Sequence, residues 1–173
     1  MGPRLVVIGP PGAGKTTVAR LVAGRLGVPF ADSDEAVEHV AGRSISDIFV
    51  DDGESTFREL EREAVSRLLA GSDGVLSLGG GAVLDPRTEQ DLRGRPVVFL
   101  DVGISDAAKR VGFASGRPLL SINPRAQWTA LMTTRRPVYE RIAAFTVDTA
   151  ARQPDDVADE VVTKLLQHEG IER

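Results

Sequence analysis

The residues most able to do chemistry in this sequence form one short run near its N-terminus. Gly9-Pro10-Pro11-Gly12-Ala13-Gly14-Lys15-Thr16 matches the pattern G-x-x-x-x-G-K-[ST], in which glycines let backbone N–H groups approach phosphate oxygens closely. The apolar run Leu5–Ile8 precedes it and an apolar helical pattern follows it. The loop is therefore expected to join a strand to a helix whose positive end points at the anion. This arrangement predicts a site for a nucleoside triphosphate.

The residues of this loop have separate expected roles. Lys15 would reach the β- and γ-phosphates, and Thr16 would offer its hydroxyl to Mg²⁺. Lysine is a rare choice in this chain, since only Lys15, Lys109 and Lys164 occur beside many arginines. We expect the nucleotide to contact Gly12, Ala13, Gly14, Lys15, Thr16 and Thr17.

The same loop serves kinases, GTPase switches and motor ATPases, so it does not define the reaction. A GTPase would normally carry an Asn-Lys-x-Asp motif, but the only asparagine is Asn123, which Pro124 follows. A large ATPase motor needs far more than 173 residues. A small kinase remains, and its acceptor site must be sought in the other motifs.

Two carboxylates, Asp32 and Asp34, follow the second expected strand. Alternation along a strand would place both on one side, at the sheet edge that faces the ligand. One carboxylate could then hold a metal-bound water while the other accepts a hydroxyl proton. An Asp-Ser-Asp run before a helix is also a common capping arrangement, and the spacing alone leaves both interpretations open.

Glycines and arginines supply the remaining candidates for an acceptor site. Gly79–Gly81 follows an apolar run, where missing side chains let the backbone approach a ligand. Arg58 and Glu61 share one helix face, and Arg135 and Arg136 form a basic pair. A flexible turn, a surface ion pair and a solvated basic patch are the alternatives. Two arginines converging on one crevice favour an acceptor with a carboxylate, which matches the guanidinium fork.

These residues must be positioned by alternating strands and helices. Short apolar runs between turn residues predict buried parallel strands, and longer apolar patterns with three-to-four spacing predict helices. The alternation indicates a layered α/β sheet with right-handed crossovers. The expected strands are 4–9, 29–32, 74–78, 96–101 and 145–147, and the expected helices are 15–26, 34–40, 45–50, 54–69, 86–92, 105–111, 126–144 and 155–167.

Composition limits the function further. The formal net charge of −4 argues against nucleic acid or an anionic membrane as the main partner. The chain has no cysteine, which excludes disulfides and thiolate metal sites. No signal pattern or membrane-length apolar run is present. We expect one domain spanning residues 1–173, in the cytoplasm, and a monomer.

The segment from about 112 to 124 fits neither pattern, since it is rich in Gly, Pro and Ser and carries Arg117. Long irregular loops in compact domains are often lids or binding loops. We therefore expect a mobile lid here.

Taken together, these motifs resemble the shikimate kinase family, closest to its actinobacterial members. The resemblance runs from about residue 4 to about residue 160, with matching order and spacing. It implies a three-layer P-loop kinase fold like that of nucleoside monophosphate kinases, with a five-stranded parallel sheet of order 2-3-1-4-5. The motifs that carry it are 9–17, Asp32-Ser33-Asp34, Arg58-x-x-Glu61, Ser77-Leu78-Gly79-Gly80-Gly81, Arg117-Pro118-Leu119-Leu120 and Arg135-Arg136-Pro137.

The resemblance also implies a reaction, in which the γ-phosphoryl of ATP passes to the 3-hydroxyl of shikimate on the pathway to the aromatic amino acids. It assigns Asp34, as catalytic group, and Arg58, Gly80 and Arg136 to shikimate. The acceptor-binding helices are then about 33–61. The same likeness adds Gly79, Gly81, Glu61, Phe49 and Phe57 to the acceptor site.

On the nucleotide side, the resemblance implies that Thr16 binds Mg²⁺ directly and Asp32 binds it through water. Lys15 and Arg117 would act as catalytic cations, with Arg117 closing over the phosphates. Arg110 and Arg152 would flank the adenine. The third strand ends in Ser77 and glycines where many P-loop proteins have an aspartate, which leaves the metal-directed carboxylate to Asp32.

Two other functions stay open at this stage. The chain could phosphorylate another small polyol or sugar acid, such as gluconate. It could also be a regulatory nucleotide-binding module without turnover, in which case the acceptor motifs would be coincidental.

Overall fold

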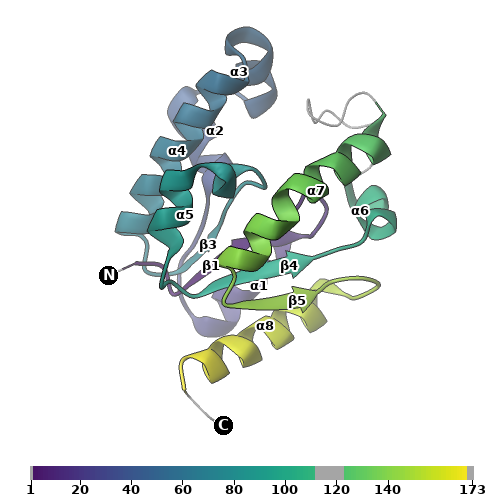
Figure 1. Ribbon diagram of the computed structural model, residues 1–173. Helices are drawn as coiled ribbons and strands as arrows, with labels where there is room; N and C mark the ends of the chain where they lie inside the picture. Colours follow the sequence, from purple (N-terminus) through teal and green to yellow (C-terminus); the bar gives the residue numbers. More distant parts are fainter. Residues whose placement is uncertain (1, 112–122, 171–173) are drawn as a thin grey trace.

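The computed structural model describes residues 2–111 and 123–170. Five parallel strands form one sheet in the order β2-β3-β1-β4-β5, as Figure 1 shows. This confirms the predicted sheet and its order. The strands are β1 (Leu5–Ile8), β2 (Phe30–Asp32), β3 (Val75–Ser77), β4 (Val97–Asp101) and β5 (Phe145–Asp148).

Helices alternate with these strands and cover the sheet. They begin and end within a few residues of the predicted bounds, and one short 3₁₀ turn, η1, was not predicted. The helices are α1 (Lys15–Leu26), α2 (Ser33–Ala41), α3 (Ile45–Asp52), α4 (Glu54–Gly71), η1 (Ala82–Leu84), α5 (Pro86–Leu92), α6 (Ile104–Val111), α7 (Pro124–Ile142) and α8 (Pro154–His168).

Local signals explain where several helices start and stop. Ser44 caps α3 by accepting a hydrogen bond from the Asp47 amide at 3.1 Å, and Asp85 caps α5 with Pro86 in its first turn. Gly27 and Gly42 end α1 and α2 in the left-handed conformation, which glycine adopts without steric cost.

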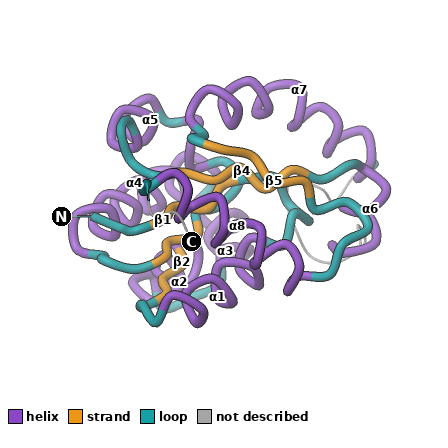
Figure 2. Tube along the Cα trace, turned by 90° about the horizontal axis from the view of Figure 1, so that it is seen from below, coloured by secondary structure: helices purple, strands orange, loops and turns teal. Residues whose placement is uncertain are grey.

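The main hydrophobic core lies between the sheet and its helices. β1 is buried at every position, as are β3 and the first four residues of β4, which explains why these strands read as continuous apolar runs. Helices α1 and α8 pack against each other below the sheet in Figure 1, and Figure 2 shows them from that side. The opposite face carries α4, α5 and α7. The sheet is therefore a rigid platform covered on both faces.

A second, smaller core lies outside this platform. Val37, Ile48, Phe57 and Ala64 form a separate buried cluster among α2, α3 and α4. These helices rise above the sheet in Figure 1. The acceptor-binding helices predicted from the sequence thus rest on a cluster of their own.

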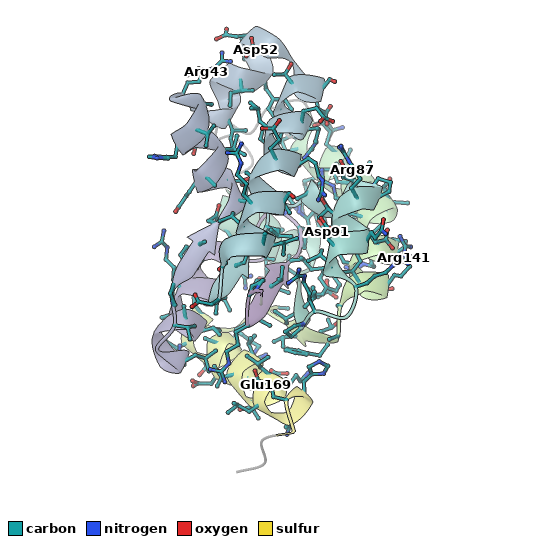
Figure 3. All side chains as sticks on the ribbon, turned by 90° about the vertical axis from the view of Figure 1, so that its left-hand side faces the viewer. Arg43, Asp52, Arg87, Asp91, Arg141 and Glu169 are labelled. Carbon is teal, nitrogen blue, oxygen red and sulfur yellow. The ribbon has the colours of Figure 1, made fainter. Side chains whose placement is uncertain are left out.

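Ion pairs lie on the outer surface, and Figure 3 labels several of the side chains that form them. Arg43 pairs with Asp52 at the tip of α3, Arg62 pairs with Asp91, and Arg141 pairs with Glu89. Pairs that are fully exposed contribute little to stability, whereas Arg62 and Asp91 are partly buried. Within the described part of the chain, no helix combines the length and apolarity that a bilayer crossing requires.

Candidate active site

The nucleotide-binding loop surrounds one end of a cavity of about 670 Å³ at the carboxyl ends of the strands. It follows β1 and leads into α1, as predicted. Gly12 has φ +86°, and a Cβ built there would lie 2.8 Å from the Cα of Ala107, so only glycine fits. The predicted nucleotide contacts Gly12, Ala13, Gly14, Lys15, Thr16 and Thr17 all line this cavity.

The start of α1 is suited to an anion. Within these fully described residues, no side chain caps the helix and its first turn holds no acidic residue. Its N–H groups and the positive end of its dipole therefore face the cavity without a capping side chain. The Lys15 ammonium donates to the Pro10 carbonyl at 3.0 Å, which keeps this cation beside the loop.

Asp32 caps α2 with one carboxylate oxygen and contacts Thr16 with the other. Its Oδ1 accepts hydrogen bonds from the amides of Asp34 (2.8 Å) and Glu35 (3.1 Å) and so caps α2. Its Oδ2 accepts a hydrogen bond from the Thr16 hydroxyl at 3.0 Å. The capping interpretation and the metal-site interpretation are thus compatible in one carboxylate.

The oxygen groups around Thr16 suit Mg²⁺, a hard cation that prefers oxygen and keeps several waters or phosphate oxygens. Thr16 and Asp32 are adjacent, and Ser77 lies beside Asp32 in the strand register. The buried Ser77 hydroxyl has no hydrogen-bond partner among the described residues. No cluster of three metal-ligating side chains occurs in residues 2–111 and 123–170.

The far side of the cavity is closed by the predicted adenine residues. Arg110 on α6 donates to the Thr149 carbonyl at 2.6 Å and to the Gly12 carbonyl at 3.2 Å. Arg152 donates to Glu160 at 2.6 Å and also lines the cavity. Both arginines therefore line the cavity, and their contact with the adenine stays a prediction. Arg117 lies outside the described residues.

The opposite end of the site is built around the glycine run Gly79–Gly81. A Cβ on Gly79 would lie 2.7 Å from Asp34 Oδ1 and 2.9 Å from Glu61 Oε2, so two carboxylates approach the chain where a side chain would block them. A Cβ on Gly81 would lie 2.6 Å from the guanidinium of Arg58. The structure thus brings together Asp34, Arg58, Glu61 and the glycine run.

One step of the sequence argument for Asp34 was wrong. Strand alternation was expected to align Asp34 with Asp32, but β2 ends at Asp32 and α2 begins at Ser33. Asp34 reaches the cavity from the first turn of a helix. The Ser33 hydroxyl accepts a hydrogen bond from the Gly79 amide at 2.9 Å, which joins this turn to the glycine run.

Glu61 is the most unusual carboxylate of the group. It is 3% exposed, and its burial raises its pKa, while the charge of Arg58 and the 2.8 Å hydrogen bond from that guanidinium oppose the rise. The pair is held on one face of α4, as the i,i+3 spacing predicted. Glu61 therefore orients Arg58 toward the glycine run.

The structure departs from the sequence prediction at Arg136. Its guanidinium makes two hydrogen bonds to Asp101 at the end of β4, at 2.8 and 2.9 Å, and does not lie against the glycine run. Successive helix residues point about 100° apart, so the neighbouring side chain faces the site instead. Arg135 is 3% exposed, and a Cβ on Gly80 would lie 3.1 Å from its NH1.

Arg135 was not chosen from the sequence, because the adjacent arginines carry no pattern that separates them. Its Nε has no hydrogen-bond partner among the described residues. Tyr139, one turn later, donates its hydroxyl to the Gly80 carbonyl at 2.6 Å. Burial raises the pKa of Tyr139 to about 12, so this hydroxyl stays protonated and remains a donor.

Phe49 and Phe57 lie nearer to the small core than to an open pocket. Phe57 is 4% exposed, and the two rings lie 4.8 Å apart. The Arg58 guanidinium lies 5.2 Å from the Phe57 ring, within the range of a cation–π contact. The Phe57 ring therefore contacts Arg58, and Phe49 packs against Phe57.

Comparisons with known proteins identify the family. A family model described as shikimate kinase matches residues 11–166. The shikimate kinase of Thermobifida fusca (strain YX) is 51% identical over 163 residues, which cover 94% of this chain and 95% of that protein. That of Saccharopolyspora erythraea is 51% identical over 166 residues, 95% of each chain.

A solved structure agrees. Shikimate kinase from Acinetobacter baumannii in complex with shikimate has a TM-score of 0.92 and 33% sequence identity, and the match covers 98% of this chain and 96% of that one. The resemblance inferred from the motifs is confirmed, and the chain belongs to the shikimate kinase family.

Proposed function

We propose that this protein is an ATP-dependent kinase that transfers the γ-phosphoryl group to the 3-hydroxyl of shikimate, giving shikimate 3-phosphate and ADP. The observation that carries the proposal is the group around Gly79–Gly81. Two guanidinium groups, from Arg58 and Arg135, lie against adjacent glycines, and Asp34 lies beside the same run and lines the cavity of the phosphate loop. Family membership supports the same substrate.

The acceptor would be held by charge and shape. Arg58 and Arg135 suit a carboxylate, which accepts paired hydrogen bonds from a guanidinium. Glu61 already occupies one side of Arg58, whereas the Nε of the buried Arg135 has no partner among the described residues. We assign the main grip on the acceptor carboxylate to Arg135, in place of Arg136, with Gly80 and the other glycines allowing close approach.

Asp34 is the proposed catalytic carboxylate. It lines the nucleotide cavity and lies beside the glycine run, so it can orient the acceptor hydroxyl and accept its proton. Phosphoryl transfer depends mainly on positioning and on charge stabilisation. Lys15 and the amides of the phosphate loop provide that charge, and Arg117 is proposed to add to it.

Mg²⁺ is proposed as the cofactor, with Thr16 as its direct ligand and Asp32 holding a metal-bound water. When bound, the ion would neutralise charge on the phosphates. Thr16 supplies an oxygen at the start of α1. Among the described residues, Asp32 supplies the carboxylate that accepts a hydrogen bond from the Thr16 hydroxyl.

A coupled assay tests the proposal. Purified protein is incubated with MgATP, and ADP release is followed with shikimate, with gluconate and with neither. We expect rapid release only with shikimate. Equal or faster release with gluconate would instead support a sugar-acid kinase, and ATP binding without acceptor-dependent release would support a regulatory module. Light scattering of the same sample tests the expectation of a monomer.

A further inference from the structure

Helix α7 contacts the phosphate loop from outside the nucleotide cavity. Trp128, in the second turn of this helix, is 4% exposed, and its indole Nε1 donates to the Pro11 carbonyl at 2.9 Å. It is the only tryptophan in the chain. None of the described residues that line the cavity belongs to α7, so Trp128 can act on the nucleotide only through the loop.

The carbonyls of this loop are held one after another. The Pro10 carbonyl accepts from the Ala13 amide at 3.2 Å and from Lys15. The Pro11 carbonyl accepts from Trp128, and the Gly12 carbonyl accepts from Arg110 at 3.2 Å. Three successive oxygens are therefore engaged by protein donors, one of which is the loop's own Ala13 amide.

The position of Trp128 matters because Pro10 and Pro11 have no N–H. The Gly12 amide is the first one available after them. In a trans peptide the carbonyl and the following N–H point in opposite directions, and no cis peptide occurs among the described residues. A Pro11 carbonyl held toward α7 thus directs the Gly12 N–H away from α7, toward the cavity that Gly12 lines.

The flexibility of Gly12 means that the Pro11–Gly12 peptide needs a contact from outside the loop to fix its orientation. Gly12 has a positive φ of 86°, and glycine moves readily between backbone conformations. If this peptide rotated, it would present an oxygen to the phosphates in place of an N–H group. We propose that Trp128 is a positioning residue that holds the Pro11–Gly12 peptide in the orientation that binds phosphate. The inference rests on the proposed nucleotide site and is independent of the acceptor's identity.

The substitution Trp128→Phe removes the N–H donor and keeps an aromatic ring. We expect the Kd for MgADP, measured by calorimetry without acceptor, to rise about fivefold, the effect of one lost hydrogen bond. The Kd for shikimate alone should stay within twofold. The matched control is Thr133→Ala on the same helix, because the Thr133 hydroxyl is exposed and its bond among the described residues stays within α7, to the Thr129 carbonyl.

These measurements separate positioning from a structural role. A variant that unfolds at lower urea concentration but binds MgADP like the wild type would overturn the inference. Failure of the proposed function has a different signature, since a wild-type protein without shikimate-dependent turnover can still show the loss of MgADP affinity in Trp128→Phe.

A second measurement needs no variant. The single tryptophan gives one indole N–H resonance in an ¹H–¹⁵N spectrum of the wild-type protein. We expect this proton to exchange slowly with solvent and its resonance to shift when MgADP is added. Rapid exchange, or a resonance that saturating MgADP does not move, would contradict the proposal.

Discussion

The nucleotide side and the acceptor side of the site are built differently. The nucleotide side consists mostly of backbone: a glycine-rich loop and the start of α1, mounted on the main core. The acceptor side consists of charged side chains from α2, α4 and α7, and two of these helices rest on the separate small core. Backbone amides recognise what all nucleotides share, whereas side chains recognise one acceptor.

The largest effect is expected from Lys15, the main side chain on the nucleotide side. Lys15→Ala should lower kcat by roughly 10²–10³, because it removes a preorganised charge at the transferred group. The shikimate Kd should stay near the wild-type value, since Lys15 lies in the loop and not at the glycine run. Steady-state kinetics and calorimetry measure the two quantities, and unchanged turnover would refute the role of Lys15.

The two neighbouring arginines provide a matched pair on the acceptor side. Arg135→Ala should raise the KM for shikimate by about thirtyfold, or about 2 kcal/mol, the lower end for removing one partner of a buried charged pair. Arg136→Ala should change it less than about twofold, because its half-exposed bond to Asp101 lies outside the acceptor group. The reverse order of effects would restore the original assignment to Arg136.

Substituting one buried isoleucine in each core compares the main core with the small core directly. Ile8→Val in β1 and Ile48→Val in α3 each remove one methylene from a fully packed position and should each lower the free energy of unfolding by about 1 kcal/mol. Only Ile48→Val should also raise the KM for shikimate, because its cluster supports the acceptor helices. Urea denaturation and kinetics check both. Equal effects on shikimate binding would show that the two cores do not act separately.

The smallest effect is expected on stability, when a change of pH titrates the Glu61 carboxyl. Burial raises the pKa of this carboxyl in the folded protein above its ordinary value of 4.5, so ionisation of Glu61 costs stability. As the pH rises from 4.5 through the raised pKa, wild type should lose stability relative to Glu61→Gln, and the difference should then level off. Urea denaturation across this range measures it. If wild type instead gained stability relative to Glu61→Gln as the pH rises, the charge of Arg58 would affect the pKa of Glu61 more strongly than burial does.

The contrast between a nucleotide side built from backbone and an acceptor side built from side chains explains how much the sequence could predict. The strands could be predicted from the sequence because a buried parallel strand is a continuous apolar run, as in Leu5–Ile8. The phosphate loop could be predicted from the sequence because its function depends on glycine spacing along the chain. The turn η1 was missed because its three residues are too few to show a periodicity.

The acceptor side was only partly predictable, since it depends on tertiary neighbours. Arg135 and Arg136 are equivalent by sequence, and Asp101, far away in the chain, engages one of them. The pairing of Arg58 with Glu61 was predictable because helical spacing alone brings them together. Asp34 was chosen correctly as a cavity residue, but from a strand argument that the early start of α2 overturned.

The two oxygens of Asp32 allow the cap of α2 and the contact with Thr16 to be changed separately at a single residue. One oxygen caps α2 and the other meets Thr16. An asparagine placed there could keep its carbonyl over the helix start and turn an amide donor toward the threonine hydroxyl. Such a protein would retain the helix that carries Asp34, while the group that faces Thr16 changes from acceptor to donor.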